Sequence, residues 1–467
     1  MDQTHYFGGT GETHFHPAVI VFLILASLLI LVIRRQYVIY PFLFAAVLVP
    51  LSQVVIVGGV HFMALRILVL VGWLRVIVSS AFPGKQTPVV PMTSIDKAFL
   101  LWMMSSTVMF TVLWGQWGSF INAMGLAYTD LGLLFLFRFL IRDNDDVERS
   151  IKALGYVCIV CGILMLGEQI VHLNVFGYFG DLPSLTVEFR EGKYRSQASF
   201  LHPLLAGAFG ATIFPMFIGL WVKNKKARVA AGIGLIGCML MAVTSMSSTS
   251  LMAIFAGSCA LALWPMRRRM RLIRWVVAVV LIALHLVMKA PVWALIARID
   301  LMGGSSGYHR FELVNQTIVR FREWWLVGTT NQANWGWDMW DNIDWYVAQC
   351  TTGGLLTFIL FVAIIVYGFK RIGKSRKEAE IANDRSTEFF MWTLGATLFS
   401  NAVTFIGVSY FDQSIVAWLT FLAIVSAATH IYKAGAVAEL PVETVALHRP
   451  YLMPRRRPRK AGVLIHS

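Results

Sequence analysis

Residues 303–354 read GGSSGYHRFELVNQTIVRFREWWLVGTTNQANWGWDMWDNIDWYVAQCTTGG, and they form the longest polar interruption in an otherwise apolar chain. The stretch is rich in Trp, Asn, Arg and Asp, whereas residues 276–287 before it and residues 355–369 after it are apolar. Apolar segments of this kind are typical of membrane spans. The sequence therefore predicts a polar, aromatic-rich loop between two spans, and we expect the functional side chains in this loop.

The composition of the whole chain indicates a membrane protein. Of its 467 residues, 57% are hydrophobic and 14% are charged, whereas a soluble protein carries about 25% charged residues. A chain this apolar cannot hide its hydrophobic side chains in one water-soluble core. The net charge of +15 is spread in short clusters between apolar runs. Such clusters are typical of orientation signals, so we expect no nucleic acid among the partners.

The apolar segments predict an all-α polytopic membrane protein. A span needs about 20 predominantly apolar residues, so residues 1–433 are expected to form about 12–13 transmembrane helices. Residues 434–467 are rich in Pro and Arg, and we expect a basic, disordered cytoplasmic tail there. The predicted spans lie near residues 18–33, 40–59, 62–81, 98–115, 119–140, 151–171, 203–221, 229–245, 248–265, 275–293, 352–369, 389–407 and 412–432.

Clusters of Lys and Arg orient the predicted spans, because cytoplasmic loops carry an excess of these residues. The clusters recur after every second span, among them those at residues 34–35, 138–152, 223–228, 267–274 and 370–377. We therefore place these loops in the cytoplasm. Two large loops, residues 172–202 and 294–351, are then predicted to be extracytoplasmic.

The first half of the central loop has the pattern of an amphipathic helix over residues 308–325. Ser305 or Ser306 is expected to cap its start and Gly328 to end it. One interpretation is a helix in the headgroup region, with Trp as interface anchors and Arg on lipid phosphates. The apolar side chains that recur at steps of three and four residues are Phe311, Val314, Ile318, Phe321 and Trp325.

A second interpretation rests on the cations of both outer loops. Positive charge on the outer side opposes the orientation rule, yet Arg190, Lys193 and Arg195 stand in the loop 172–202. Arg310 and Arg320 fall on a polar face of the predicted helix. Arg presents a planar fork that grips phosphate oxygens at two points. Two such loops near a bilayer suit an anionic, lipid-linked substrate.

The second half of the loop is expected to be a helix that begins near Trp337 and continues into the next span. Asp338, Asp341 and Asp344 would then stand at positions i, i+3 and i+6, so that neighbouring carboxylates lie close together. Such carboxylates are able to bind a divalent cation. The spacing lacks a Gly-centred loop, however, and we predict no metal site here.

The chain resembles the O-antigen ligase and polymerase family of bacterial envelope glycosyltransferases over about residues 194–369. The first piece of this resemblance is YRSQASFLHPLLAGAFGA, an Arg-containing segment followed by a His-Pro turn and a helix of small residues. The second is the Ser-rich TSMSSTSLMAIFAG. The third comprises GYHRFELVNQTI, WWLVGTT and DNIDWYVAQCTTGGLLTFILF. The order of the pieces, with a large outer loop between spans, carries the resemblance.

The resemblance implies a GT-C-like enzyme of the bacterial inner membrane. It would move a glycan from a polyprenyl diphosphate carrier to an acceptor sugar hydroxyl at the outer face, without a cofactor, in cell-envelope or exopolysaccharide assembly. Its partners would be the lipid-linked glycan donor, a glycan or lipid-linked acceptor, membrane lipids and other polysaccharide-assembly proteins. By the same resemblance, Arg195 and Arg310 would hold the diphosphate.

The sequence departs from the family at the position of the general base. The family places a His before the Asn in the second half of the loop, whereas this chain has Asp341 before Asn342. Asp341 is our predicted base, and an apolar setting made by Trp337, Trp340 and Trp345 would raise its pKa. Asp341 could instead orient the acceptor, and Asp344 or His309 could be the base.

Further candidates come from the spans and from the residues around the arginines. Arg66 lies within a predicted span, where a charge marks a function or a buried pair. Together with Arg195, the predicted substrate-binding residues are His202, His309, Arg320, Asn342, Asp344 and Arg66.

The alternative function is a transporter or flippase of a lipid-linked or anionic solute. A transporter would place its polar residues at the middle of the bilayer, and this chain concentrates them in outer loops.

Overall fold

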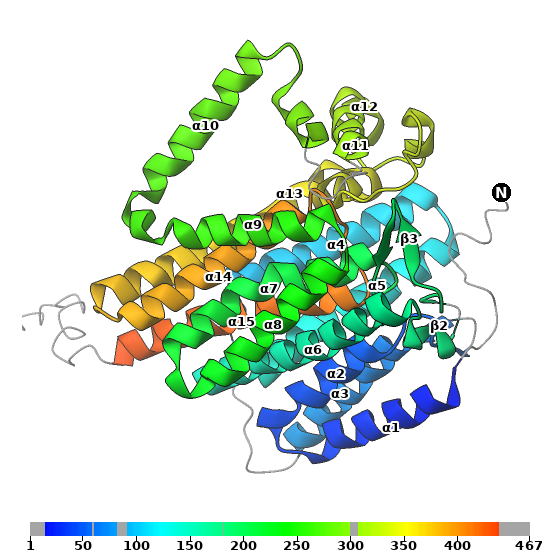
Figure 1. The fold of residues 1–467 in the computed structure, drawn as a ribbon, viewed down its shortest axis with the longest axis vertical. Helices are drawn as coiled ribbons and strands as arrows, with labels where there is room; N and C mark the ends of the chain where they lie inside the picture. Colours follow the sequence, from blue (N-terminus) through cyan, green and yellow to red (C-terminus); the bar gives the residue numbers. More distant parts are fainter. Residues whose placement is uncertain (1–14, 58–59, 82–90, 181, 299–306, 439–467) are drawn as a thin grey trace, which may run out of the picture.

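The computed structural model describes residues 15–57, 60–81, 91–180, 182–298 and 307–438, and these are mostly helical. The predicted caps Ser305 and Ser306 and residues 439–467 lie outside the described residues. The last helix ends at Ala438, a few residues past the predicted start of the tail. Figure 1 shows a bundle of long helices that run side by side, with the helices of the central loop gathered at one end.

Fifteen helices are assigned in the described part of the chain. They are α1 Pro17–Val32, α2 Ile39–Leu48, α3 Ala64–Ala81, α4 Ser94–Trp114, α5 Trp117–Leu140, α6 Asn144–Val171, α7 Pro203–Lys223, α8 Arg228–Thr244, α9 Ser248–Ala262, α10 Met270–Val287, α11 Gly307–Val319, α12 Phe321–Trp324, α13 Trp345–Ile381, α14 Arg385–Thr404 and α15 Gln413–Ala438. Two antiparallel hairpins accompany them, β1 Val54–Val57 with β2 Val60–Met63 and β3 Glu188–Arg190 with β4 Lys193–Arg195.

The structure confirms an all-α architecture with many helices able to cross a membrane. Nine helical segments of the described residues are long and apolar enough to do so, and three more apolar helices are shorter. The predicted span 40–59 is wrong. Its helix α2 has only 10 residues, and the chain then pairs β1 with β2. Pro50 cannot continue a helix, and the following VVIV is β-branched and suits a strand.

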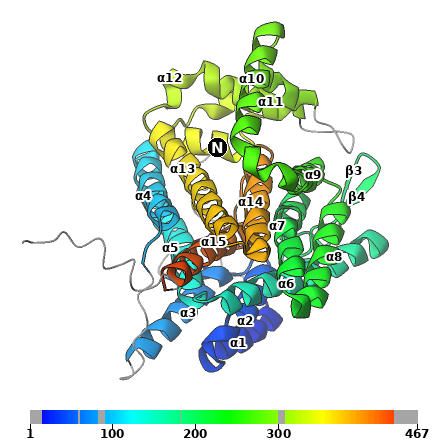
Figure 2. The ribbon, with the colours of Figure 1, turned by 90° about the vertical axis from the view of Figure 1, so that its left-hand side faces the viewer.

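The helices α15 and α7 form the centre of the bundle, and α10 lies outside it. In the most apolar stretch of each helix, 94% of the residues of α15 and 83% of those of α7 are buried. None of the residues in the corresponding stretch that includes α10 is buried. Figure 1 shows α10 standing apart from the bundle beyond α9, and Figure 2 shows α13 between α4 and α14. An apolar helix with no protein around it is suited to lipid contact.

The cationic loops meet at one end of the bundle, which we call the basic end. Arg35 after α1 pairs with Asp146 at the start of α6 at 2.6 Å. Arg267 after α9 pairs with Glu388 at the start of α14 at 2.7 Å, and Arg376 near the end of α13 reaches the same carboxylate at 2.9 Å. Loops that the sequence assigned to one side therefore share one end of the molecule.

The central loop corrects two predictions about its helices. The second helix, α13, begins at Trp345 and not near Trp337, because the carboxylate of Asp344 caps it by accepting the N–H of Val347 at 3.0 Å. Asp338 and Asp341 therefore lie in a non-helical segment, and the predicted helical spacing of the three aspartates is wrong.

The first helix of the loop, α11, buries polar side chains and exposes part of its apolar surface, whereas a helix of a soluble protein usually does the reverse. Its buried residues are Gly307, Arg310, Leu313 and Thr317. Three residues of the predicted apolar stripe, Ile318, Phe321 and Trp325, are exposed, whereas Val314 packs against the cluster that contains Leu313 and Trp324. The polar face therefore packs against the rest of the protein, and the exposed apolar face suits a headgroup environment.

Two glycines join the central loop to the bundle. The backbone of α13 is kinked at Gly354, whose φ is +71°. Beside this kink, the N–H of Leu355 donates to the carbonyl of Trp325 at 2.9 Å. A Cβ at Gly354 would lie 2.5 Å from the Leu326 carbonyl oxygen, and one at Gly328 (φ +100°) would lie 2.3 Å from that of Thr351. Only Gly permits this close approach.

Candidate functional site

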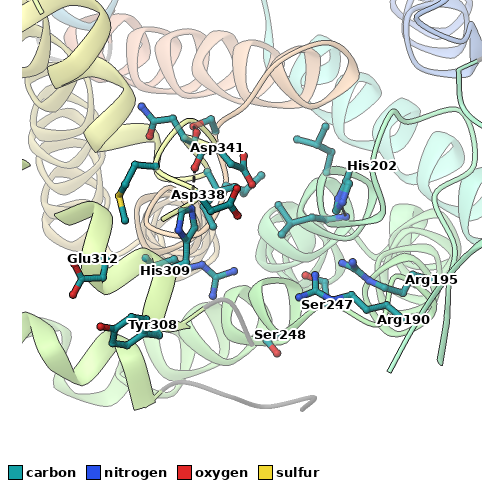
Figure 3. A pocket seen from close by; sticks show the side chains of 18 of the residues that line it. Arg190, Arg195, His202, Ser247, Ser248, Tyr308, His309, Glu312, Asp338 and Asp341 are labelled. Carbon is teal, nitrogen blue, oxygen red and sulfur yellow. Dashed lines mark hydrogen bonds between the residues drawn. The ribbon is translucent and has the colours of Figure 1, made fainter. Parts of the chain in front are cut away.

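A cavity of about 760 Å³ opens where the loop 172–202 and the central loop meet. Segments far apart in the sequence line it: the β3–β4 hairpin with the start of α7, the turn before α9, and α11 with the loop that follows it. Figure 3 shows Arg190, Arg195, His202 and Ser247 on one side and Tyr308, His309, Asp338 and Asp341 on the other. The end of the bundle opposite to the basic end therefore holds a polar cavity that arginines and carboxylates line from both sides.

Arg195 is placed by the β3–β4 hairpin. The hairpin pairs it with Glu188, and the guanidinium Nη1 lies 2.8 Å from the Glu188 carboxylate. The side chain is buried, and its Nε has no hydrogen-bond partner among the described residues. The Glu168 carboxylate fixes the turn after Arg195 by accepting the N–H groups of Gln197 and Ala198, each at 2.8 Å.

His202 combines a structural contact with a place in the cavity wall. Its Nδ1 caps α7 by accepting the N–H of Leu204 at 3.1 Å. Its Nε2 lies 3.7 Å from the Glu188 carboxylate, which thus faces both His202 and Arg195. Burial lowers the pKa of His202, and the Glu188 carboxylate offsets this in part. The wall therefore carries one guanidinium and one imidazole around a shared carboxylate.

Arg310 lies on the buried face of α11 and is almost completely enclosed. Its Nη2 donates to the hydroxyl of Thr249 at the start of α9, at 2.8 Å. Its Nε is buried and lacks a hydrogen-bond partner in the part of the chain that the structure describes. Burial lowers the pKa of Arg310, and the carboxyl group of Asp344 partly offsets this. A buried cation with unused donors suits an anionic ligand.

The wall that holds Arg310 also carries an imidazole and two carboxylates. His309 Nε2 donates to the backbone carbonyl of Asp341 at 2.9 Å, which joins α11 to the loop. The ligating atoms of His309, Asp338 and Asp341 all lie within 4.8 Å of one another. Burial raises the pKa of Asp341, His309 opposes the rise, and Asp338 adds to it. Asp338 has a left-handed backbone with φ +58°.

Asn342 also lines the cavity, as predicted from its place after Asp341. Its side-chain Nδ2 donates to the Thr351 hydroxyl at 2.9 Å, and its backbone carbonyl accepts a hydrogen bond from the Ser409 hydroxyl at 3.0 Å. These contacts tie the loop to α13 and to the segment before α15. Six of the predicted site residues therefore share this cavity: Arg195, His202, His309, Arg310, Asp341 and Asn342.

Three predicted site residues lie outside the cavity lining. Asp344 is buried as the cap of α13, and burial raises its pKa to about 7. Arg320 pairs with Glu323 at 3.0 Å on the outer surface of the loop. Arg66 donates to the carbonyl of His61 at the start of α3. These three side chains are engaged elsewhere, so we withdraw them from the candidate site.

The predicted apolar setting for Asp341 is also wrong. Trp337 is 86% exposed and Trp340 is 72% exposed, so neither of them covers a carboxylate. Trp345 is buried, but it packs against Trp102, Phe361 and Phe405 inside the bundle. The exposed indoles suit contact with lipid headgroups.

The sequence did not reveal two partners of the arginines. Glu188 shares a hairpin with Arg195, and only the pairing of β3 with β4 brings them together. Thr249 belongs to the Ser-rich segment that carried the second piece of the resemblance, and this composition was the available signal. The three pieces of the resemblance therefore meet at one cavity.

In comparisons with known proteins, the chain matches no family model and no curated protein.

Proposed function

We propose that the protein is a membrane glycosyltransferase of the ligase or polymerase type. It moves a glycan from a polyprenyl diphosphate carrier to a hydroxyl group of an acceptor sugar. The reaction takes place at the outer face of a bacterial plasma membrane and serves the assembly of cell-envelope or exported polysaccharide.

One observation carries this proposal. Arg195 and Arg310 line the same cavity, although they belong to two loops that are far apart in the sequence. Both guanidinium groups are buried, and each keeps an Nε donor unused among the described residues. Burying a cation is costly unless a partner compensates it. A diphosphate provides several oxygens for such donors.

In this proposal the cavity has a donor side and an acceptor side. The diphosphate binds at Arg195 and Arg310, and the acceptor hydroxyl lies toward Asp341. The acceptor oxygen bonds to the anomeric carbon as the bond from that carbon to the phosphate oxygen breaks. The electron pair leaves with the diphosphate, and the hydroxyl proton passes to the Asp341 carboxylate.

The arginines act on the leaving group. Negative charge grows on the diphosphate as the glycosidic bond breaks, and fixed cations outside bulk water stabilise that transition state. The exposed part of the apolar stripe of α11 and the indoles of Trp337 and Trp340 hold the loop at the bilayer surface. The lipid carrier then reaches the arginines without leaving the membrane.

The reaction is tested with purified protein in lipid nanodiscs. A polyprenyl diphosphate-linked oligosaccharide and an acceptor glycan are added, and products are measured by mass spectrometry. The wild type is expected to consume the donor and elongate the acceptor. Arg195→Ala is expected to lose about 100-fold in rate, because it removes one stabilising donor. Arg322→Ala, an exposed Arg of the same loop outside the cavity lining, is the matched control.

Two results would overturn the proposal. The first is a wild type that leaves donor and acceptor unchanged. The second is equal product from wild type and Arg195→Ala. If the protein in liposomes moves the intact donor between leaflets and forms no product, the alternative function as a flippase replaces the enzyme.

A further inference from the structure

The side of the cavity formed by α11 and the loop before α13 has the composition of a cation site. His309, Asp338 and Asp341 each offer one ligand atom, and these three atoms lie within 4.8 Å of one another. His309 comes from α11, whereas the two aspartates come from the loop before α13. Folding of the central loop, and not sequence proximity alone, therefore assembles the group. Figure 3 shows the three side chains together on one side of the cavity.

The hydrogen bond of His309 determines which ring nitrogen is available. The carbonyl of Asp341 can only accept, so Nε2 carries the proton in this contact. In a neutral ring, Nδ1 then has the lone pair. Nδ1 is buried and has no hydrogen-bond partner within the described ranges. A metal-binding His typically donates its other N–H to a carbonyl or carboxylate in this way, which fixes the ring and its tautomer.

A second, independent observation concerns Arg310. Arg310 follows His309 in α11 and lines the same cavity. Its side chain is only 5% exposed, and its Nε has no hydrogen-bond partner among the described residues. Its unused donor suits an anion in the cavity that the carboxylates of Asp338 and Asp341 also line. An anion next to carboxylates is repelled unless a cation lies between them. Divalent cations commonly bridge protein carboxylates and phosphate oxygens.

We propose that His309, Asp338 and Asp341 form a binding site for a divalent metal ion of the Mn²⁺ or Mg²⁺ class. Two ligands at about 2.1 Å from one ion are at most about 4.2 Å apart. The widest spacing of 4.8 Å therefore closes by about 0.6 Å, which small side-chain rotations provide. Three protein ligands leave coordination positions for water and for phosphate oxygens.

The role of the ion rests on the proposed function, although the site itself does not. The ion would bind the diphosphate across the cavity from Arg195 and neutralise part of its charge. A carboxylate that binds through one oxygen leaves its second oxygen available. Asp341 can therefore hold the ion and still accept the proton of the acceptor hydroxyl.

The site is tested by electron paramagnetic resonance with Mn²⁺ alone. Full-length protein in nanodiscs is stripped with EDTA, dialysed and titrated with Mn²⁺. The wild type is expected to bind one equivalent. Asp338→Asn and His309→Gln are expected to weaken this binding at least tenfold. Glu312→Gln is the matched control, because Glu312 lines the same cavity but is not one of the three ligands.

A pulsed measurement on the wild type makes the test independent of how the variants fold. Bound Mn²⁺ is expected to show magnetic coupling to a nitrogen nucleus, that of the His309 ring. Absence of stoichiometric binding, absence of nitrogen coupling, or unchanged binding in both ligand variants would each overturn the proposal. No glycan enters this experiment, so its failure is distinct from failure of the transferase reaction.

Discussion

Arg138 in α5 and Arg310 in α11 are two arginines with nearly equal burial and different surroundings. Arg138 is 4% exposed and Arg310 is 5% exposed. The Nε of Arg138 pairs with the Asp96 carboxylate at 3.2 Å, and Asp96 is itself held in the capping box of α4. Arg310 donates to the neutral hydroxyl of Thr249 and forms no ion pair with a described residue.

The difference distinguishes Arg138, whose charge is paired inside the bundle, from Arg310, which we propose to bind a ligand. A buried charge needs a partner, and the protein supplies one for Arg138 within its own bundle. For Arg310 the protein supplies a hydroxyl and a cavity. The remaining stabilisation is left for a ligand. Removal of the Arg138 side chain should therefore lower mainly stability, and removal of the Arg310 side chain should lower mainly activity.

The largest effect is expected for Arg138→Ala on stability. The substitution leaves the Asp96 carboxylate buried and unpaired, which costs about 3–5 kcal/mol. Unfolding of the purified protein in detergent, followed by circular dichroism, measures the loss. The double variant Arg138→Leu with Asp96→Asn removes both charges and should recover most of it. If Arg138→Ala unfolds at the wild-type temperature, the pair has no structural role and the comparison fails.

Arg310→Ala is expected to reduce transfer rather than stability. Loss of one donor to the developing charge lowers the rate about 10²- to 10³-fold. Arg310→Lys keeps the charge but loses the planar fork, so it should recover only part of the rate. The assay is transfer from the polyprenyl diphosphate donor, with Arg320→Ala as the control because Arg320 pairs outside the cavity. Equal rates for the two alanine variants would contradict the assignment.

Gly407→Ala should displace the Arg310 side chain, because a methyl group at this position meets Thr249 and Arg310. A Cβ at Gly407 would lie 3.0 Å from the Thr249 side chain and 3.3 Å from Arg310 Nε. The Arg310 guanidinium must then shift by a few tenths of an ångström, and we expect about a tenfold lower transfer rate, since catalysis is sensitive to placement. Gly395→Ala is the control, because its Cβ meets Ile372 at an ordinary 3.6 Å. A rate unchanged in both variants would show that Arg310 tolerates displacement.

Much of the architecture could be predicted because membrane spans are long apolar runs with positive charge at one end. The same reasoning failed at residues 40–59, since a short apolar run of β-branched residues suits a strand as well as a helix. Arg195 was singled out because its charge lies on the predicted outer side, and it does line the cavity with Arg310. Sequence patterns identified the two cations, but not the hairpin partner Glu188.

The acidic residues of the central loop show the limit of periodicity. Asp338, Asp341 and Asp344 have helical spacing, yet only the chain after Asp344 is helical. A capping aspartate and a helical one look alike in sequence, because both precede an apolar run. The apolar stripe of α11 suited a helix in the headgroup region but did not decide that Arg310 and Thr317 would be buried against the protein.

Asp344 gives the sharpest expected pH dependence. Burial raises its pKa from 3.8 to about 7, so the folded protein binds a proton that the unfolded chain releases near pH 4. Stability is therefore greatest below about pH 4 and falls as the pH rises toward 7. Asp344→Asn keeps a capping side chain and should flatten this fall, whereas Asp344→Ala should cost about 1 kcal/mol at about pH 4, before the fall begins, through the lost cap. Thermal unfolding between pH 4 and pH 8 measures both effects. An Asp344→Asn variant with the wild-type pH dependence would show that another group titrates in this range, and Asp344 would then join Arg138 as a residue whose charge is compensated inside the protein.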